Sequence, residues 1–310
     1  MKGKYKMTTT IENGAKLTFE NEFMHLAQQQ RSKLESSPAV RYVDPDGKTH
    51  NLSRMGAVEL TEVNSRNPRK NYVDYKLDNR QFTKRRFTAS ILIDEKDDIN
   101  ELLKDPTSDL MQELLKAKGR VIDRVICEAA GGAVLVGRPD RAPSSVSASS
   151  DGVVTVNATA GLTAAKIQEV IENSINADLD MDDIMNTTFL CTGKENTALM
   201  AEEKFINNDY ISARPVESGV QKKASAFNVV LFAGSSAGAG TKANPVLEEV
   251  STTRTCLALA PNSVAVMLKL ARFDVKEADD YVNSRSLTID LWIGAMRTEG
   301  VRVQKVTTTI

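Results

Sequence analysis

The amino-acid sequence predicts an α+β fold, and three observations support this prediction. Apolar and polar residues alternate in short runs between about residues 40 and 93, a period of two that is typical of β-strands. The longest helical pattern of the chain follows over residues 107–131. From there to the end, short helix and strand patterns alternate, which is typical of a protein built from mixed layers.

The composition favours a globular protein that is not an enzyme. Hydrophobic residues make up 41% of the 310 residues, which is enough to bury a core. The 40 Lys and Arg nearly balance the 41 Asp and Glu, so there is no overall positive field to hold nucleic acid or an anionic membrane surface. Two His and three Cys leave few groups for acid–base catalysis or soft-metal binding. We therefore expect no catalytic residue, no cofactor and no metal.

The chain is also expected to be made in the cytoplasm and to stay out of membranes. No run approaches the ~18 apolar residues of a membrane span. The basic start, MKGKYK, is followed by polar residues rather than by the apolar run of a signal peptide.

The first two segments are an arm and a set of strands. Residues 1–39 are mostly polar, with one amphipathic patch around Phe19 and Phe23 that predicts a short helix. Residues 40–93 predict strands and long hairpins. They have no helix of their own to cover their apolar face, so we expect another part of the assembly to cover it. The alternating apolar positions are Val58, Leu60, Val73, Tyr75, Leu77, Phe87, Ala89, Ile91 and Ile93.

The long helix has clear start and stop signals. Asp105-Pro106-Thr107-Ser108 is typical of a helix N-terminus, and Gly131-Gly132 ends the pattern. At ~1.5 Å per residue the helix is about 35 Å long. One face carries Leu110, Leu114, Val121, Val125 and Ala129. The opposite face is polar, as in an ordinary amphipathic core helix, and carries Gln112, Glu113, Lys116, Arg120, Asp123 and Glu128.

The second half mixes both element types after a low-complexity loop at 142–152. We expect helices over about 163–176 and 195–207. Strands are expected over 188–192, 228–233, 254–260, 263–270, 287–293 and 301–306.

Three local patterns could carry chemistry, and each has a simpler interpretation. Gly234-Ser235-Ser236-Ala237-Gly238 fits the GxSxG pattern of serine hydrolases, but loop residues follow where a helix is required, and both His precede it. Asp178, Asp180, Asp182 and Asp183 predict an acidic loop, with loose cation binding as the alternative. The three cysteines match no zinc spacing and are expected to be buried free thiols; they are Cys127, Cys191 and Cys256.

Charge is unevenly distributed along the first third of the chain. Residues 57–93 carry eight basic and four acidic residues, whereas residues 94–109 carry seven acidic and two basic residues. Solvated faces would explain such runs. The alternative is that the basic segment of one copy meets the acidic segment of the next. The candidate intersubunit residues are then Arg66, Arg69, Lys70, Lys84, Arg85, Arg86, Asp97, Asp98 and Glu101.

The order of these segments resembles the major capsid protein of tailed phages, which has the Hong Kong 97 type fold. A polar arm, a long basic two-stranded extension, a long helix and a mixed domain ending in paired strands occur in the same order in that family. Short stretches over nearly the whole chain are similar as well: Phe23 through Gln28-Gln29-Gln30 to Leu34, Arg85-Arg86-Phe87 to Ile93-Asp94, Arg120-Val121-Ile122-Asp123, Ala130-Gly131-Gly132-Ala133, Ala260-Pro261-Asn262-Ser263-Val264 and Gly294-Ala295-Met296-Arg297.

The resemblance implies a division of the chain and a cover for the extended strands. In that family the extended loop lies across a neighbouring subunit, whose peripheral domain would bury its apolar face. The implied parts are an N-terminal arm (1–39), an extended β-hairpin loop (40–93), a peripheral domain (94–159) with a spine helix (107–131), an axial domain (160–265) and closing strands that return to the peripheral domain (266–310).

The resemblance also implies a function. Copies of the chain would assemble in the host cytoplasm into pentamers and hexamers of an icosahedral phage head that encloses double-stranded DNA and holds it only weakly. Portal and decoration proteins are the further partners it implies. Because only about 40 residues precede the extended loop, we expect a separate scaffolding protein. An encapsulin-like shell, which would enclose a cargo enzyme, is the alternative within this fold.

Overall fold

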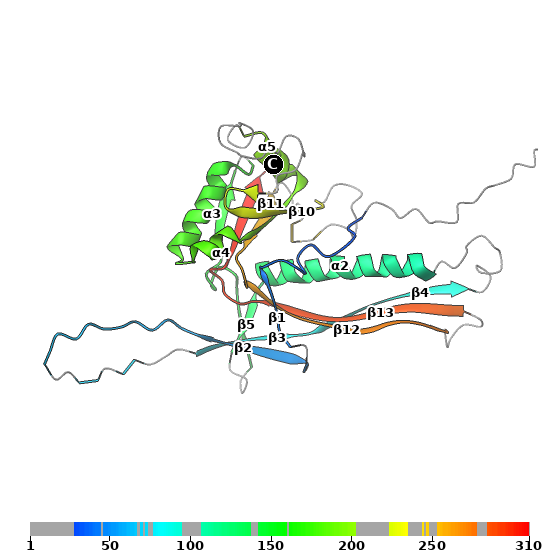
Figure 1. Cartoon of the computed structure of the whole chain (residues 1–310), viewed down its shortest axis with the longest axis horizontal. Coiled ribbons are helices and arrows are strands. Elements are labelled where there is room, and N and C mark those ends of the chain that lie inside the picture. The colour runs from blue at the N-terminus through cyan, green and yellow to red at the C-terminus, as the bar shows by residue number, and fades with distance from the viewer. Residues whose placement is uncertain are drawn as a thin grey trace, which may run out of the picture.

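The protein folds into three β-sheets and four helices over the residues that the computed structural model describes (Figure 1). It is therefore an α+β protein, as the sequence predicts. The described residues are 28–44, 46–66, 69–70, 72–73, 77–94, 107–137, 142–159, 161–202, 223–234, 244, 246–247, 253–277 and 284–309.

A four-stranded sheet runs along the elongated part of the molecule in the order β1-β12-β13-β4 (Figure 1). Strands β12 and β13 form a long antiparallel hairpin, β4 pairs antiparallel with β13, and β1 pairs parallel with β12. Both hairpin strands are longer than expected, and in β12 the charged residues Arg272 and Asp274 interrupt the apolar pattern of the outer half. The strands are β1 (Val40–Tyr42), β4 (Arg85–Asp94), β12 (Val264–Glu277) and β13 (Ser284–Arg297).

Helix α2 (Thr107–Gly131) lies along one face of this sheet, over the range predicted for the long helix (Figure 1). Leu114 of α2 packs on Ile93 of β4 and on Leu287 and Ile289 of β13. The expectation that the strands of residues 40–93 have no helix to cover them is therefore wrong for β4. Helix α2, the next described element after β4, covers the apolar face of that strand.

A second sheet, also of four strands, forms the base of a long projection, which is defined here as residues 55–77. Strands β2 (Thr49–Met55) and β3 (Leu77–Thr83) pair antiparallel from Thr49 with Thr83 to Met55 with Leu77. Strand β3 also pairs with β5 (Val134–Val136), which directly follows α2, and β5 pairs with β6 (Ser144–Val146). The projection is thus anchored to the C-terminal end of α2.

The third sheet has six strands in the order β7-β14-β11-β8-β10-β9 and forms a separate lobe (Figure 1). Helices α3 (Ala164–Asn176), α4 (Met181–Met185) and α5 (Gly193–Met200) accompany it. Its core includes Ile167 and Val170 of α3 and Phe189 at the centre of the sheet. The strands are β7 (Val154–Ala158), β8 (Thr188–Thr192), β9 (Lys223–Ala224), β10 (Phe227–Phe232), β11 (Thr253–Leu259) and β14 (Val303–Thr309).

The sheets divide the chain differently from the sequence-based boundaries. Strand β7 belongs to the six-stranded sheet although it precedes residue 160, and β14 belongs to it although it follows residue 266. The turn between β13 and β14 carries the chain from one sheet to the other within five residues, Thr298 to Arg302. In the described part of the chain, no helix is long and apolar enough to cross a membrane.

A buried polar cluster joins the base of the projection, the long hairpin and the end of α2. The carboxylate of Asp151 accepts hydrogen bonds from Arg80 of β3 and from Arg297 of β13, and both arginines are 0% exposed. Nη1 of Arg297 also donates to the carbonyl oxygens of Ala130 and Gly132, at 2.8 and 2.9 Å. A cation is favourable at this position, because the C-terminal end of a helix carries partial negative charge. Burial lowers the pKa of Arg297, and the hydrogen bond to Asp151 opposes this shift.

The polar face of α2 is covered rather than solvated around Asp123. A strap, defined here as residues 28–42, crosses the helix at this point. The Asp123 side chain accepts hydrogen bonds from the backbone N–H groups of Lys33 and Leu34, and it is 2% exposed. The strap lies so close that a Cβ at Gly119 would approach the Ser32 nitrogen to 2.7 Å. An amphipathic pattern places Asp123 on the polar face, but it cannot show that a distant segment covers that face.

Replacing Asp151 tests the importance of the buried cluster. The Asp151→Asn variant removes the negative charge that compensates two buried guanidinium groups, so we expect the free energy of unfolding to fall by about 3–5 kcal/mol. Urea denaturation of the unassembled subunit measures this change. The control is Asp46→Asn, an exposed carboxylate, which should change stability by less than about 0.5 kcal/mol. Equal effects of the two substitutions would contradict the role of the cluster.

Candidate intersubunit surfaces

The projection exposes an unusual number of apolar side chains. Leu60 is 99% exposed and Tyr72 is 86% exposed. Single exposed apolar residues are common, but a group of them indicates a surface for binding. The exposed apolar residues of the projection are Met55, Val58, Leu60, Val63, Tyr72, Val73 and Leu77.

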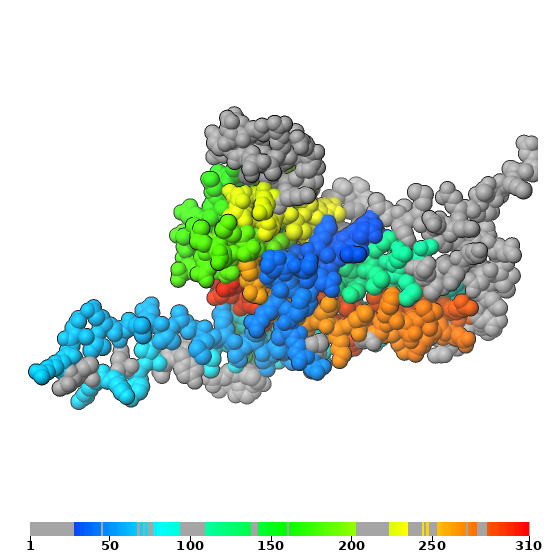
Figure 2. Space-filling view, in the orientation of Figure 1, coloured from blue at the N-terminus to red at the C-terminus, as the bar shows by residue number. Residues whose placement is uncertain are grey.

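The middle of the projection forms no strand in its described residues, which are 56–66, 69–70 and 72–73. The prediction of a strand at Val58 and Leu60 is therefore wrong for the isolated subunit. The projection extends away from the body, as Figure 2 shows, and residues 56–66, 69–70 and 72–73 pair with no strand in the described part of the chain. The period-two pattern remains as a row of exposed apolar groups.

Three of the six basic candidates lie on this projection. Arg66, Arg69 and Lys70 are exposed, beside the exposed apolar residues. Their predicted acidic counterparts, Asp97, Asp98 and Glu101, lie outside the described residues. The structure therefore brings the three basic candidates together on one accessible segment.

The other basic candidates lie at the beginning of β4 and have partners within the chain. Nη2 of Arg85 lies 2.8 Å from Oε2 of Glu128 on α2, and Nη2 of Arg86 lies 2.8 Å from Oδ2 of Asp290 on β13. The Arg85–Glu128 pair is exposed on both sides and contributes little to stability, whereas the Asp290 side chain is buried, and its hydrogen bonds with Thr88 and Arg86 lower its pKa. Lys84 is partly buried and precedes them.

Strand β12 presents a second exposed apolar row, which the sequence pattern did not identify. Leu270, Phe273 and Val275 are all exposed. Their strand partners Leu291, Ile289 and Leu287 are buried, and side chains at paired positions lie on the same face of a sheet. The row therefore lies on the face that carries α2, outside the area that the helix covers. A change of register between Leu270 and Arg272 breaks the period-two pattern that could have revealed it.

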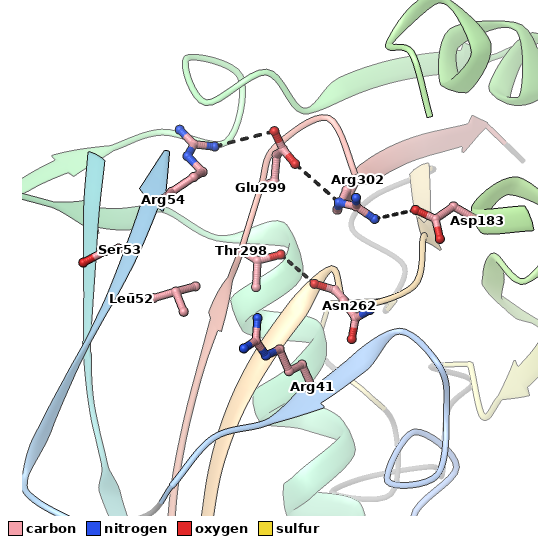
Figure 3. Close-up of a pocket in the computed structure, with 9 residues that line it drawn as sticks. All are labelled: Arg41, Leu52, Ser53, Arg54, Asp183, Asn262, Thr298, Glu299 and Arg302. Atoms are coloured by element: carbon pink, nitrogen blue, oxygen red, sulfur yellow. Dashed lines mark hydrogen bonds and ion pairs between the residues drawn. The ribbon is translucent and has the colours of Figure 1, made fainter. Parts of the chain in front are cut away.

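A polar hollow of about 600 Å³ lies where the base of the projection meets the six-stranded lobe (Figure 3). Arg302 extends between two carboxylates, with Nη1 2.8 Å from Asp183 and Nε 3.3 Å from Glu299. Figure 3 shows Arg54 of β2 on the other side of Glu299, at 3.9 Å. The residues around the hollow are Arg41, Leu52, Ser53, Arg54, Asp183, Asn262, Thr298, Glu299 and Arg302.

The hollow is held by ion pairs between elements rather than arranged for a reaction. Arg302 compensates Asp183, which is one member of the predicted acidic loop. The other three members are Asp178, Asp180 and Asp182, and in the described part of the chain no group of three His, Cys, Asp or Glu could hold a metal ion. Thr298 donates to the carbonyl oxygen of Asn262 at 2.7 Å, which joins the turn between β13 and β14 to the turn between β11 and β12. The arrangement joins the lobe to the base of the projection.

The chemical patterns of the sequence have structural explanations where they are described. Cys127, Cys191 and Cys256 are all free and buried, as predicted. Burial raises the pKa of Cys191 to about 12 and raises those of Cys127 and Cys256 well above their usual range. Of the GxSxG pattern only Gly234 is described, and residues 235–238 lie outside the described residues.

Comparisons with known proteins identify a family and a fold. The phage capsid protein family matches residues 11–309. The capsid of Helicobacter pylori bacteriophage KHP30 superposes with a TM-score of 0.70 at 10% identity, covering 99% of this chain and 100% of that one. The cyanophage Pam1 capsid gives 0.68 at 13% identity, with 99% of both chains covered. The capsid of cyanophage P-SCSP1u gives 0.67 at 14% identity, with 94% and 92% covered. Among curated proteins, none matches the chain.

These findings confirm the predicted fold class and the prediction that the protein is structural rather than enzymatic. The likeness to each capsid extends over nearly the whole chain. At these low identities the likeness shows the fold alone.

The buried thiols lead to a prediction about reactivity. A thiol reacts as its thiolate, and burial both raises the pKa of each cysteine and blocks access to it. We expect the native subunit at pH 8 to react negligibly with a disulfide reagent such as dithionitrobenzoate, and all three thiols to react after unfolding in guanidinium chloride. Absorbance of the released thionitrobenzoate measures this, and rapid reaction of a native thiol would contradict it.

Proposed function

The chain belongs to the phage capsid protein family, and we propose that its copies assemble as pentamers and hexamers into an icosahedral head that encloses double-stranded DNA. A structural role in the phage capsid and self-assembly into its lattice follow from the family. The observation that best supports the finer proposal is the projection, whose apolar side chains are exposed in the single subunit.

We assign the parts of the capsid fold to the sheets as follows. The four-stranded sheet with α2 corresponds to the peripheral domain and its spine helix. The six-stranded lobe corresponds to the axial domain, and it includes β7 and β14. The extended loop comprises β2, β3 and the projection between them, whereas β4 belongs to the peripheral sheet. The sheet pairing and the cover of β4 by α2 support this assignment.

The projection would dock on a neighbouring subunit. Burying one Leu or Phe side chain contributes about 1.5–3 kcal/mol, so covering even a few of the exposed residues is a substantial driving force for association. The exposed row Leu270, Phe273 and Val275 on β12 offers an apolar surface of the peripheral domain for this contact. Beyond its pairing with β1, the described outer edge of β12 also has backbone groups available to an added strand.

Charge would set the register of this contact. Arg66, Arg69 and Lys70 of one copy would face Asp97, Asp98 and Glu101 of the next. Complementary charges contribute more to specificity and to the association rate than to affinity, because like charges disfavour incorrect alignments. The exposure of the three basic residues on the projection supports this pairing.

The remaining partners follow from the family resemblance. We propose a separate scaffolding protein, a portal and a decoration protein as partners, and assembly in the host cytoplasm before the head becomes part of the virion. The net charge of -1 supports weak contact with the packaged DNA, because few phosphate charges can be neutralised by the chain as a whole.

Reversing the charge of the projection tests the register hypothesis. In the triple variant Arg66→Glu, Arg69→Glu and Lys70→Glu, we expect shell assembly to be blocked at physiological salt, while the subunit remains folded because these residues are exposed. Electron microscopy measures assembly, and circular dichroism measures folding. The control keeps the charges, with Arg66→Lys, Arg69→Lys and Lys70→Arg, and should form shells. Normal shells from the reversed variant would show that the charge hypothesis is wrong.

Leu60 tests the apolar part of the same contact. Since Leu60 is 99% exposed, Leu60→Ser should change the free energy of unfolding of the subunit by less than about 0.5 kcal/mol. The same substitution should raise the critical concentration for assembly, measured by light scattering, by about tenfold or more, because each copy loses one buried contact. Leu60→Met is the control and should assemble normally. Unchanged assembly of Leu60→Ser would show that this side chain remains exposed in the shell.

A further inference from the structure

The strap contacts three parts of the molecule that are otherwise far apart in sequence. At its start, Gln28 hydrogen-bonds to Glu113 and to Arg120 of α2. In its middle, Lys33 donates to the carbonyl oxygen of Leu231 at the end of β10, in the six-stranded lobe. At its end, β1 pairs with β12 of the four-stranded sheet. The strap therefore connects the helix, the lobe and the long sheet.

The middle of the strap is anchored by one side chain. Oδ2 of Asp123 lies 3.0 Å from the Lys33 nitrogen, and Oδ1 lies 3.1 Å from the Leu34 nitrogen. Oδ1 also accepts a hydrogen bond from the Ser32 hydroxyl at 2.6 Å. Hydrogen bonds to a buried carboxylate are about twice as strong as those between neutral groups. Because backbone N–H groups provide two of these bonds, the anchor fixes the path of the chain and not only a side chain.

The hydrogen bonds of Asp123 position an apolar contact between the six-stranded lobe and the four-stranded sheet that carries α2. Leu34 is fully buried in a core that includes Ile122 and Ile126 of α2, Leu190 of β8 and Leu291 of β13. These residues come from the helix, the six-stranded sheet and the four-stranded sheet. Three residues later, the Ser37 hydroxyl lies 2.8 Å from that of Thr188 on β8. Leu34 thus fills the junction at which both sheets meet α2.

We propose that the strap is a releasable tie that fixes how the six-stranded lobe sits on α2, and that Asp123 is the positioning residue that holds it closed. Before β1 the strap forms no β-ladder, so its attachment depends on Asp123, on Leu34 and on a few polar contacts. Such a segment opens locally at a much lower free energy than the sheets. Opening withdraws Leu34 from the junction and removes the contact with Thr188.

The tie has a consequence for shells, which rests on the proposed function. A shell of one size requires that subunits in the same position of the shell hold the same angle between the six-stranded lobe and α2. With the tie released, the lobe keeps the remaining apolar junction, the Asp151 cluster and the ion pairs of Arg302 but loses the contacts of the strap, so subunits in one preparation differ more in that angle. Shells assembled from such subunits would vary more in diameter than shells of the unchanged protein.

Local opening of the unassembled subunit tests the tie directly. In Asp123→Ala we expect hydrogen exchange at the amides of residues 33 and 34 to rise by about tenfold or more, with trypsin cleavage after Arg31 or Lys33 rising in parallel, since both amides lose their hydrogen bonds to the carboxylate and the Ser32 hydroxyl loses its bond as well. Exchange at β8 and β11 should be unchanged. Asp123→Asn keeps one acceptor oxygen and should restore part of the protection. Gln112→Ala, at an exposed position of the same helix, is the control.

A second variant keeps the proposal testable if Asp123→Ala does not fold. Gly119→Ala leaves Asp123 intact but places a Cβ 2.7 Å from the Ser32 nitrogen, so it should displace the strap and raise the same two exchange rates selectively. Unchanged exchange and cleavage in both variants would overturn the tie. Shell diameters measured by electron microscopy then test the consequence. If the unchanged protein forms no shells, the proposed function fails and the exchange result still decides the tie.

Discussion

The architecture depends on one buried carboxylate shared by two arginines. Asp151 lies between Arg80, at the base of the projection, and Arg297, at the end of the long hairpin. Arg297 also binds the last carbonyl groups of α2, so a single cluster fixes the projection, the hairpin and the helix relative to one another. The following turn passes so close that a Cβ at Gly300 would lie 1.9 Å from the Asp151 carbonyl oxygen, which restricts this position to glycine. The proposed docking of the projection on another subunit needs a rigid base, and this cluster provides it.

The long helix contacts more parts of the fold than its amphipathic pattern indicates. Its apolar face covers the four-stranded sheet, and its far end contributes Ile126 and Ala130 to the junction with the six-stranded lobe. Its polar face holds the strap through Asp123 and an arginine of β4 through Glu128. Almost every part of the fold is therefore positioned against α2. A subunit organised around one helix can keep its shape while its outer segments bind different neighbours.

The sequence predicted elements whose signals are local, and it missed relations that join distant residues. Pro106 before α2 and the glycines after it mark the ends of that helix in the sequence, and α3 begins within one residue of the range expected for it. The basic group on the projection was likewise visible in the sequence. The partners of Arg85 and Arg86 were not, because they lie 43 and 204 residues further along the chain. The burial of Asp123, the sheet that contains β14 and the cover of β4 depend on the tertiary fold in the same way.

Two features of the subunit are unusual for a monomer, namely charged groups buried beside its apolar cores and apolar groups exposed on its projection. Inside, fully buried arginines and the carboxylates of Asp151 and Asp123 form clusters that tolerate little displacement, because a misplaced group would leave a buried charge unpaired. Outside, Leu60 and Tyr72 are almost fully exposed on a segment with no cover from its own chain in the part that is described. Buried ion clusters add less stability than apolar packing would, but they admit one geometry. For the proposed contacts with other copies, the exposed apolar groups of the projection must stand at fixed positions, and the internal polar clusters fix the base from which the projection extends.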